Sequence, residues 1–118
     1  MWPTNWKKIG SETPDLLSQC RGYQGQVCEF LIGHGQLLAR FYAGHPLADT
    51  LLYCTGCDVV RFHAYWKDVD VRAAISHDKQ GTMFTITDGE RLYVVCRTAE
   101  LAESRDTILS IPRLYDAA

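Results

Sequence analysis

The feature that most constrains this fold is a succession of short segments with the composition of β-strands, separated by residues that favour turns. They cover residues 26–32, 36–43, 51–57, 59–66 and 69–75, with Gly, Pro or Asp residues at several of the breaks between them. The first three are runs rich in apolar, aromatic or β-branched residues, whereas apolar and polar residues alternate in 59–66 and 69–75, which predicts a strand with one buried face in each of these two segments. The breaks are too short to hold the helices of a parallel α/β sheet, which indicates antiparallel pairing.

Two turns predict hairpins. Gly33-His34-Gly35 separates the first two extended segments and indicates that they pair. Near Asp88, a three-residue loop over 87–89 with a left-handed Gly89 would pair Phe84 with Leu92. This register places five apolar residues on one face of the hairpin: Phe84, Ile86, Leu92, Val94 and Cys96. We therefore predict a bulged hairpin whose apolar face lies in the core.

Two short helices are expected beside the strands. A helix over residues 13–21 is favoured because Pro14 suits the first helical position and Gly22 can become left-handed after the last turn. Residues 98–103 predict a second helix, which residues 107–111 either extend or follow as a last strand. Together the elements predict one α+β domain over residues 1–118. Its main part is an antiparallel sheet or half-open barrel of about six or seven strands.

Charge and apolar run length exclude several classes of partner. The chain has 12 Lys and Arg residues against 14 Asp and Glu residues, and its formal charge is −2, so no basic field attracts nucleic acid. The apolar runs are far shorter than the roughly 18 residues of a membrane span. The segment after Lys7 and Lys8 also lacks the apolar core of an export signal. These features predict a soluble, cytoplasmic protein whose five cysteines are reduced thiols.

Cys54-Thr55-Gly56-Cys57 is a compact pair of metal-capable side chains. Two cysteines at this spacing can present their thiolates to one tetrahedral zinc ion, but two further ligands must come from elsewhere. No second pair stands at zinc-finger spacing, and no helix follows to activate a redox thiolate. The alternative interpretation is that Gly56 forms a bend and that one of the cysteines packs in the core. A zinc-binding domain using Cys54 and Cys57 therefore stays an alternative function.

A second alternative is a pocket for a small anionic molecule. Arg61, His63 and Tyr65 alternate with apolar residues and so share one strand face, where they could line such a pocket. A solvated strand face explains the same pattern. The chain carries no nucleophile elbow, phosphate-binding glycine loop, zinc-protease helix or dinucleotide fingerprint, so the sequence gives no positive support for an enzyme.

Aromatic residues favour a third kind of function, binding to a protein. Tyr42, Tyr65 and Tyr93 fall on strand faces opposite the expected core and predict a docking surface. Trp2 and Trp6 precede the first helix, where they either fasten the amino terminus to the domain or anchor a partner. We therefore expect a small binding domain whose partner is another protein or a second copy, with no cofactor required.

Overall fold

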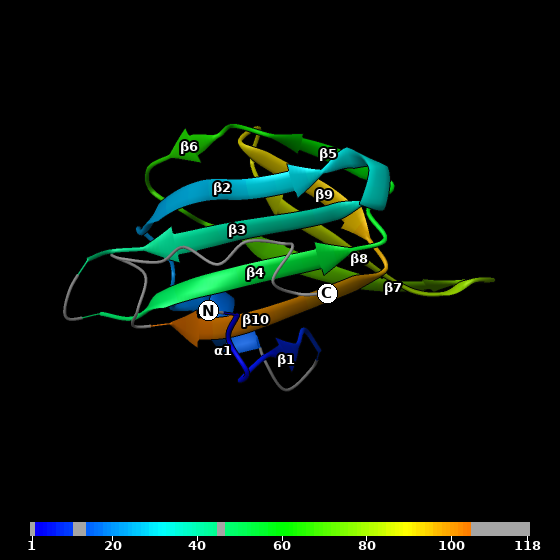
Figure 1. The fold of residues 1–118 in the computed structure, drawn as a ribbon, viewed down its shortest axis with the longest axis horizontal. Coiled ribbons are helices and arrows are strands. Elements are labelled where there is room, and N and C mark those ends of the chain that lie inside the picture. Colours follow the sequence, from blue (N-terminus) through cyan, green and yellow to red (C-terminus); the bar gives the residue numbers. More distant parts are fainter. Residues whose placement is uncertain (1, 11–13, 45–46, 105–118) are drawn as a thin grey trace.

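The computed structural model describes residues 2–10, 14–44 and 47–104, and in these residues it shows ten strands in two antiparallel sheets (Figure 1). The strands are β1 (Lys7–Lys8), β2 (Gln24–Leu31), β3 (Gln36–Tyr42), β4 (Asp49–Thr55), β5 (Val59–Phe62), β6 (Tyr65–Trp66), β7 (Arg72–Asp78), β8 (Gly81–Asp88), β9 (Leu92–Cys96) and β10 (Thr98–Ser104). Two short helices accompany them, α1 (Pro14–Ser18) and the 3-10 turn η1 (Ile32–His34). The α+β prediction is therefore wrong, because the fold is almost entirely antiparallel β-sheet.

The half-open barrel is also not formed, because the strands divide into two sheets. A six-stranded sheet has the order β1-β10-β4-β3-β2-β6, and a four-stranded sheet has the order β5-β9-β8-β7. The four-stranded sheet lies behind the larger one in Figure 1. Apolar side chains of both sheets form a single core cluster, which includes Phe41 and Leu52 from one sheet and Ile86 and Val94 from the other. The two inner faces thus bury each other.

The predicted second helix is strand β10. It pairs with β4 over its whole length, from Thr98 opposite Thr55 to Ser104 opposite Asp49, and its other edge binds β1. Its alternate residues Ala99 and Leu101 are buried in the core. Ala, Glu and Leu favour helix locally, but pairing on both edges outweighs that weak preference. Residues 107–111 lie outside the described residues.

The hairpin at Asp88 keeps its predicted face and changes its register. Phe84, Ile86, Leu92, Val94 and Cys96 are all buried, which confirms the apolar face. Asp88 pairs with Leu92, however, and Phe84 pairs with Cys96. The loop is therefore residues 89–91, with Gly89 left-handed at φ +55. The predicted hairpin at residues 33–35 is confirmed, since β2 pairs with β3.

The segment 59–66 joins the two sheets along one side of the molecule. It was expected to be one strand, but β5 belongs to the four-stranded sheet and β6 to the six-stranded sheet. Trp66 of β6 packs over Gly25 of β2, where an added Cβ atom would lie 2.5 Å from the indole ring. Only glycine leaves room for the indole there. Gly25 therefore lets Trp66 pack against the six-stranded sheet on the side where segment 59–66 joins the two sheets, which is called the closed side of the sandwich below.

Candidate functional site

The three tyrosines do not share one face. Tyr42 and Tyr65 belong to the six-stranded sheet, where their hydroxyl groups interact and where the guanidinium carbon of Arg40 lies 4.2 Å from the centre of the Tyr42 ring. Tyr93 lies on β9 of the other sheet, and Arg61 stacks on its ring at 4.8 Å. The predicted docking surface of three tyrosines is therefore split between two sheets.

The amino-terminal tryptophans pack against the six-stranded sheet. The ring centre of Trp2 lies 5.1 Å from that of Trp6 and 5.0 Å from that of Tyr53 on β4. Gln36 donates a 2.9 Å hydrogen bond to the Tyr53 hydroxyl. Both tryptophans are half-buried. This aromatic contact fastens the amino-terminal segment to the sheet, which is the first of the two roles expected for these residues.

Arg61, His63 and Tyr65 do not converge on a cavity described here. All three are exposed, and Tyr65 lies in a different sheet from Arg61. The Arg61 guanidinium is engaged by the Tyr93 ring, and the Tyr65 hydroxyl donates to the side-chain carbonyl of Gln24. Two grooves in the described part of the chain are lined by other residues. Between β5 and β6 the chain crosses from one sheet to the other, which separates side chains that a single strand would have kept together.

The cysteine pair acquires a third thiol that sequence reasoning did not include. Cys54 is buried at the end of β4, Cys57 is half-buried, and both thiols interact with the thiol of Cys96 on β9. Within residues 2–10, 14–44 and 47–104, no group of three or more His, Cys, Asp or Glu side chains is arranged to hold a metal ion. The hairpin pattern predicts that the Cys96 side chain points into the core. It does not predict that Cys96 contacts a cysteine of the other sheet.

The thiols of Cys57 and Cys96 have raised pKa values, which favours their protonated form. The hydrogen bond with Cys96, followed by burial, raises the pKa of Cys57, and the hydrogen bond with Cys54 raises the pKa of Cys96. Burial likewise raises the pKa of Cys20. A protonated, enclosed thiol is a poor nucleophile, so the cluster does not have the character of a reactive redox site.

The raised thiol pKa values predict a loss of stability in alkali. A folded-state pKa above the unfolded value stabilises the fold fully at low pH, and this contribution falls once pH exceeds the unfolded thiol pKa of about 8.5. For Cys96 the free energy of unfolding should fall by about 1.4 kcal/mol per pH unit above that point. Urea titrations at pH 8 and pH 10 should show a smaller pH-dependent loss for Cys96→Ala than for the wild type. An equal loss in the two proteins would contradict the assignment.

A buried carboxylate, Asp88, ties the closed side of the sandwich together. Its Oδ2 accepts hydrogen bonds from the Trp66 indole N–H and the Asp70 backbone N–H, each at 2.9 Å. Its Oδ1 lies 2.6 Å from the Arg91 guanidinium, which also donates to the carbonyl oxygen of Asp68. Both carboxylate oxygens are therefore occupied by the protein itself. This network holds parts of the structure together and leaves no carboxylate oxygen free to bind a ligand.

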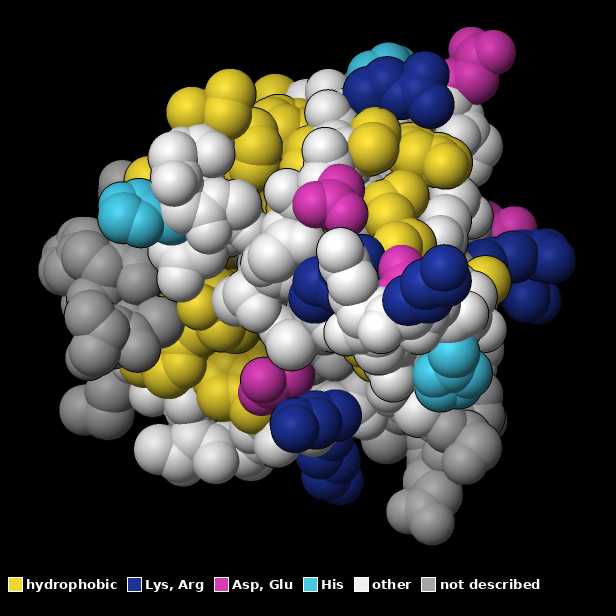
Figure 2. Space-filling view, turned by 90° about the vertical axis from the view of Figure 1, so that its right-hand side faces the viewer, with side chains coloured by type: hydrophobic (Ala, Val, Ile, Leu, Met, Phe, Trp, Pro, Cys, Tyr) yellow, Lys and Arg dark blue, Asp and Glu magenta, His cyan; other side chains and the backbone are white. Residues whose placement is uncertain are grey.

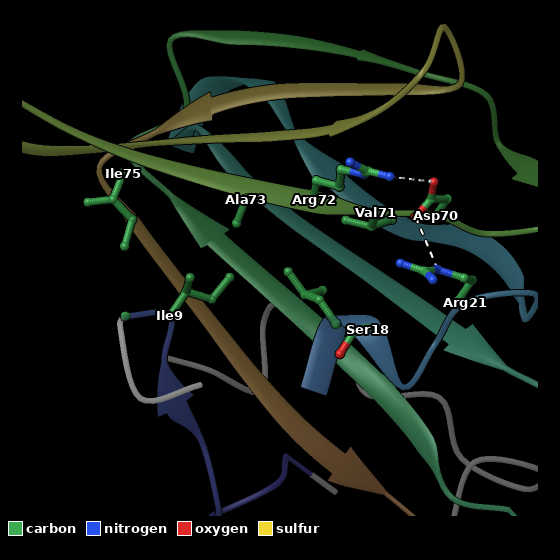
Figure 3. A pocket seen from close by; sticks show the side chains of 10 residues that line it. Ile9, Ser18, Arg21, Asp70, Val71, Arg72, Ala73 and Ile75 are labelled. Atoms are coloured by element: carbon green, nitrogen blue, oxygen red, sulfur yellow. Dashed lines mark hydrogen bonds and ion pairs between the residues drawn. The ribbon is translucent and has the colours of Figure 1, made fainter. Parts of the chain in front are cut away.

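The open side of the sandwich is the side of β1 and β7, the outermost strands opposite β6 and β5. It holds a groove of about 300 Å³ (Figure 3). Its apolar lining comes from Ile9, Leu17, Val71, Ala73 and Ile75. At its rim the carboxylate of Asp70 lies 3.6 Å from Arg21 and 3.3 Å from Arg72. Two cations thus share one anion, and both guanidinium groups are largely exposed. The groove runs beside β7, the outermost strand of the four-stranded sheet.

The outer edge of β7 presents backbone groups that β8 does not use. The hairpin loop between β7 and β8 has two residues, so the flanking pair Asp78 and Gly81 exchanges both backbone hydrogen bonds. Bonded and non-bonded pairs then alternate along an antiparallel ladder. Ile75, opposite Phe84, is therefore in a non-bonded pair, as are Ala73 and His77. The N–H and C=O groups of these three residues point away from β8, and no other described strand pairs with them.

The other three sheet edges are protected in ways that β7 is not. β1 has two residues, both lysine, and β6 also has only two residues. β5 has four residues and carries Arg61 at its third position. β7 has seven residues, and from Ala73 to Ser76 it contains no charge, proline or bulge. Natural sheets usually protect an edge by shortening, charge or proline, so β7 stands out as an edge left available for pairing.

A second exposed feature is apolar and lies elsewhere. Figure 2 shows apolar side chains gathered near the top of the molecule, the side on which Figure 1 places η1 and β5. Ile32 of η1 is 85% exposed, and Phe62 of β5 contacts Phe30 edge to face with ring centres 5.9 Å apart. β5 is also an edge strand, but it has only four residues against the seven of β7.

Comparison with models of protein families, with curated proteins and with solved structures gives no match for this chain. In the described residues, neither helix has the length and apolar character needed to cross a membrane.

Proposed function

We propose that this protein is a binding module that adds an extended polypeptide segment to the free edge of β7. The observation that carries the proposal is the outward row of backbone groups at Ala73, Ile75 and His77, on an edge strand that has no charge or proline from Ala73 to Ser76. An added strand can form a pair of hydrogen bonds with each of these residues, which is the usual basis of recognition by strand addition. Protein binding thus remains the proposed function, but the proposed contact is the edge of β7 and not the three tyrosines.

The groove beside β7 supplies what backbone pairing lacks, namely contacts for side chains. Ile75 lies on the same face as its buried neighbour Phe84, yet 43% of its surface is exposed, because the six-stranded sheet does not cover it. Every second side chain of an added strand would face the same way and cover this apolar surface. Such burial contributes about 25 cal/mol for each Å² removed from water.

The alternatives receive less support. Cys54 and Cys57 have a third thiol beside them, but the described residues supply no metal-holding arrangement. Arg61, His63 and Tyr65 are exposed and divided between two sheets. For an anion site they would have to be brought together by a movement of the β5–β6 turn. Strand addition at β7 needs no rearrangement, because its donors and acceptors are already aligned.

Replacing Ile75 with proline tests the proposal. The Ile75 N–H points away from β8, so proline removes a donor at the free edge while every hydrogen bond between β7 and β8 is kept. The tagged wild type and variant are expressed in the natural host, chemically cross-linked and purified. At least one retained polypeptide, a copy of this chain or another protein, should fall by about tenfold or more in the variant, a change of about 1.4 kcal/mol.

Two matched variants control this experiment. Ile75→Thr removes the apolar side chain and keeps the N–H, so it should retain most of the partner. Ile32→Ser removes the most exposed apolar residue on the other side of the molecule and should retain all of it. Thermal melting verifies that each variant is folded. If Ile75→Pro retains the same polypeptides as the wild type, in equal amounts, strand addition at β7 is wrong.

A further inference from the structure

We infer that the strand added to β7 is β7 of a second copy, antiparallel and related by a two-fold axis through Ile75. The inference rests on the proposed function and names its partner. Ile75 is the central residue of β7, which runs from Arg72 to Asp78, so this register pairs the whole strand with its copy. The two four-stranded sheets then become one continuous sheet of eight strands.

The free backbone groups match in this register. Ile75 lies opposite Ile75 of the partner subunit, and Ala73 lies opposite His77 of the partner subunit. All of these residues direct their N–H and C=O groups outward. Each opposed pair can exchange two hydrogen bonds, and the three pairs are the two Ala73–His77 pairs and the central Ile75 pair. No outward donor between Ala73 and His77 is then left without an acceptor.

The side chains match as well. Arg72 lies opposite Asp78 of the partner subunit on the outer face, and the two-fold axis repeats this pair of opposite charges. The Arg72 side chain is 74% exposed, and hydrogen bonds from Arg97 and the Gln80 backbone lower the pKa of Asp78, so its carboxylate is anionic at neutral pH. On the inner face Ile75 meets its own copy, which covers its exposed surface. Cross-strand pairs of these kinds are favourable.

Neighbouring registers are worse. A two-fold axis through Ala74 sets Arg72 against Ser76 of the partner subunit and carries Asp78 past the end of the opposing strand, so the pair of opposite charges is lost. An axis through Ser76 carries Arg72 past the end of the opposing strand, so its ionic partner is lost. Only the register centred on Ile75 combines full overlap with opposite charges at both ends.

The tip of the β7–β8 hairpin projects from the molecule. In Figure 1 it reaches beyond the neighbouring strands. The groove lies between β7 and the segment that contains Ile9 and Ser18 (Figure 3). The inward side chains of the added strand, among them Ile75 of the partner subunit, would face this apolar groove.

Single cysteines test the register in the full-length protein. In Ile75→Cys, the two new thiols flank the axis, where opposed Cα atoms lie about 5.5 Å apart, within disulfide range. In Ala74→Cys, each new thiol opposes Ser76 of the partner subunit, and the two introduced cysteines are offset diagonally by about 8 Å, beyond disulfide range. After mild oxidation with diamide, Ile75→Cys should form a disulfide-linked dimer and Ala74→Cys should not. An equimolar mixture of Ala74→Cys and Ser76→Cys should form one.

Sedimentation of the purified wild type from about 1 µM to about 500 µM completes the test, in the range expected for a small interface. We expect a concentration-dependent dimer for the wild type and a monomer for Ile75→Pro. Equal cross-linking of Ile75→Cys and Ala74→Cys would overturn the register. A wild type that stays monomeric throughout would overturn the second copy as partner. Strand addition would still stand in that case if another polypeptide from the host is lost with Ile75→Pro.

Discussion

Replacing Asp88 with alanine is expected to lower the free energy of unfolding by about 3–5 kcal/mol. The carboxylate is 2% exposed and accepts hydrogen bonds from the Trp66 indole and the Asp70 backbone while it pairs with Arg91. Removal leaves two enclosed donors without an acceptor and a cation without its partner. The cost of such unsatisfied groups exceeds the net contribution of the bonds themselves.

Urea unfolding monitored by tryptophan fluorescence measures this loss, and the exposed Asp58→Ala provides the comparison. The Asp58 variant should unfold at the urea concentration of the wild type, whereas the Asp88 variant should unfold at a much lower one. Equal midpoints for the two alanine variants would show that the network does not hold the β6 segment to the β8–β9 hairpin.

Replacing Phe41 with alanine should have an effect of similar size, about 3–5 kcal/mol. Phe41 is fully buried in the core cluster shared by both sheets, and its ring meets that of Trp66 edge to face with centres 6.2 Å apart. Its removal opens a cavity between two sheets that cannot easily collapse around it. Ile32→Ala, at an exposed apolar position, should change stability by less than about 0.5 kcal/mol. Similar losses in the two variants would contradict the assignment of the core.

The sequence predicts which face of a strand is buried better than it predicts which residues of neighbouring strands pair with one another. Phe84, Ile86, Leu92, Val94 and Cys96 are all buried as the alternation indicates, because parity depends only on the local pleat. The offset of the hairpin depends on its loop, which is set by the left-handed Gly89 and by Asp88 turning inward to Trp66 and Arg91. The contact with Trp66 comes from a different part of the chain, so a local pattern does not reveal it.

Segment 98–103 shows the limit of local propensity. Its Ala, Glu and Leu residues favour a helix, but β4 on one side and β1 on the other hold it extended. This error produced the α+β assignment. The division of residues 59–66 between two sheets has the same origin, since the sheet to which a strand belongs is decided by distant partners.

The candidate site was missed for a related reason. Residues 69–75 were expected to form a strand, but no local pattern states that β7 is the outermost strand of its sheet. An edge is defined by sheet order, which depends on how all of the strands pair. The one available signal was the lack of charge between Ala73 and Ser76, which is also what a central strand would show.

Amide hydrogen exchange along β7 tests the central claim most directly. The N–H groups of Ala74 and Ser76 bond to β8 and should be protected at every protein concentration, whereas those of Ala73 and His77 point outward. We predict that Ala73 and His77 are protected in the associated wild type and exchange freely in Ile75→Pro, while Ala74 and Ser76 stay protected in both. Free exchange of Ala73 and His77 in both proteins would contradict the claim that this edge binds another strand.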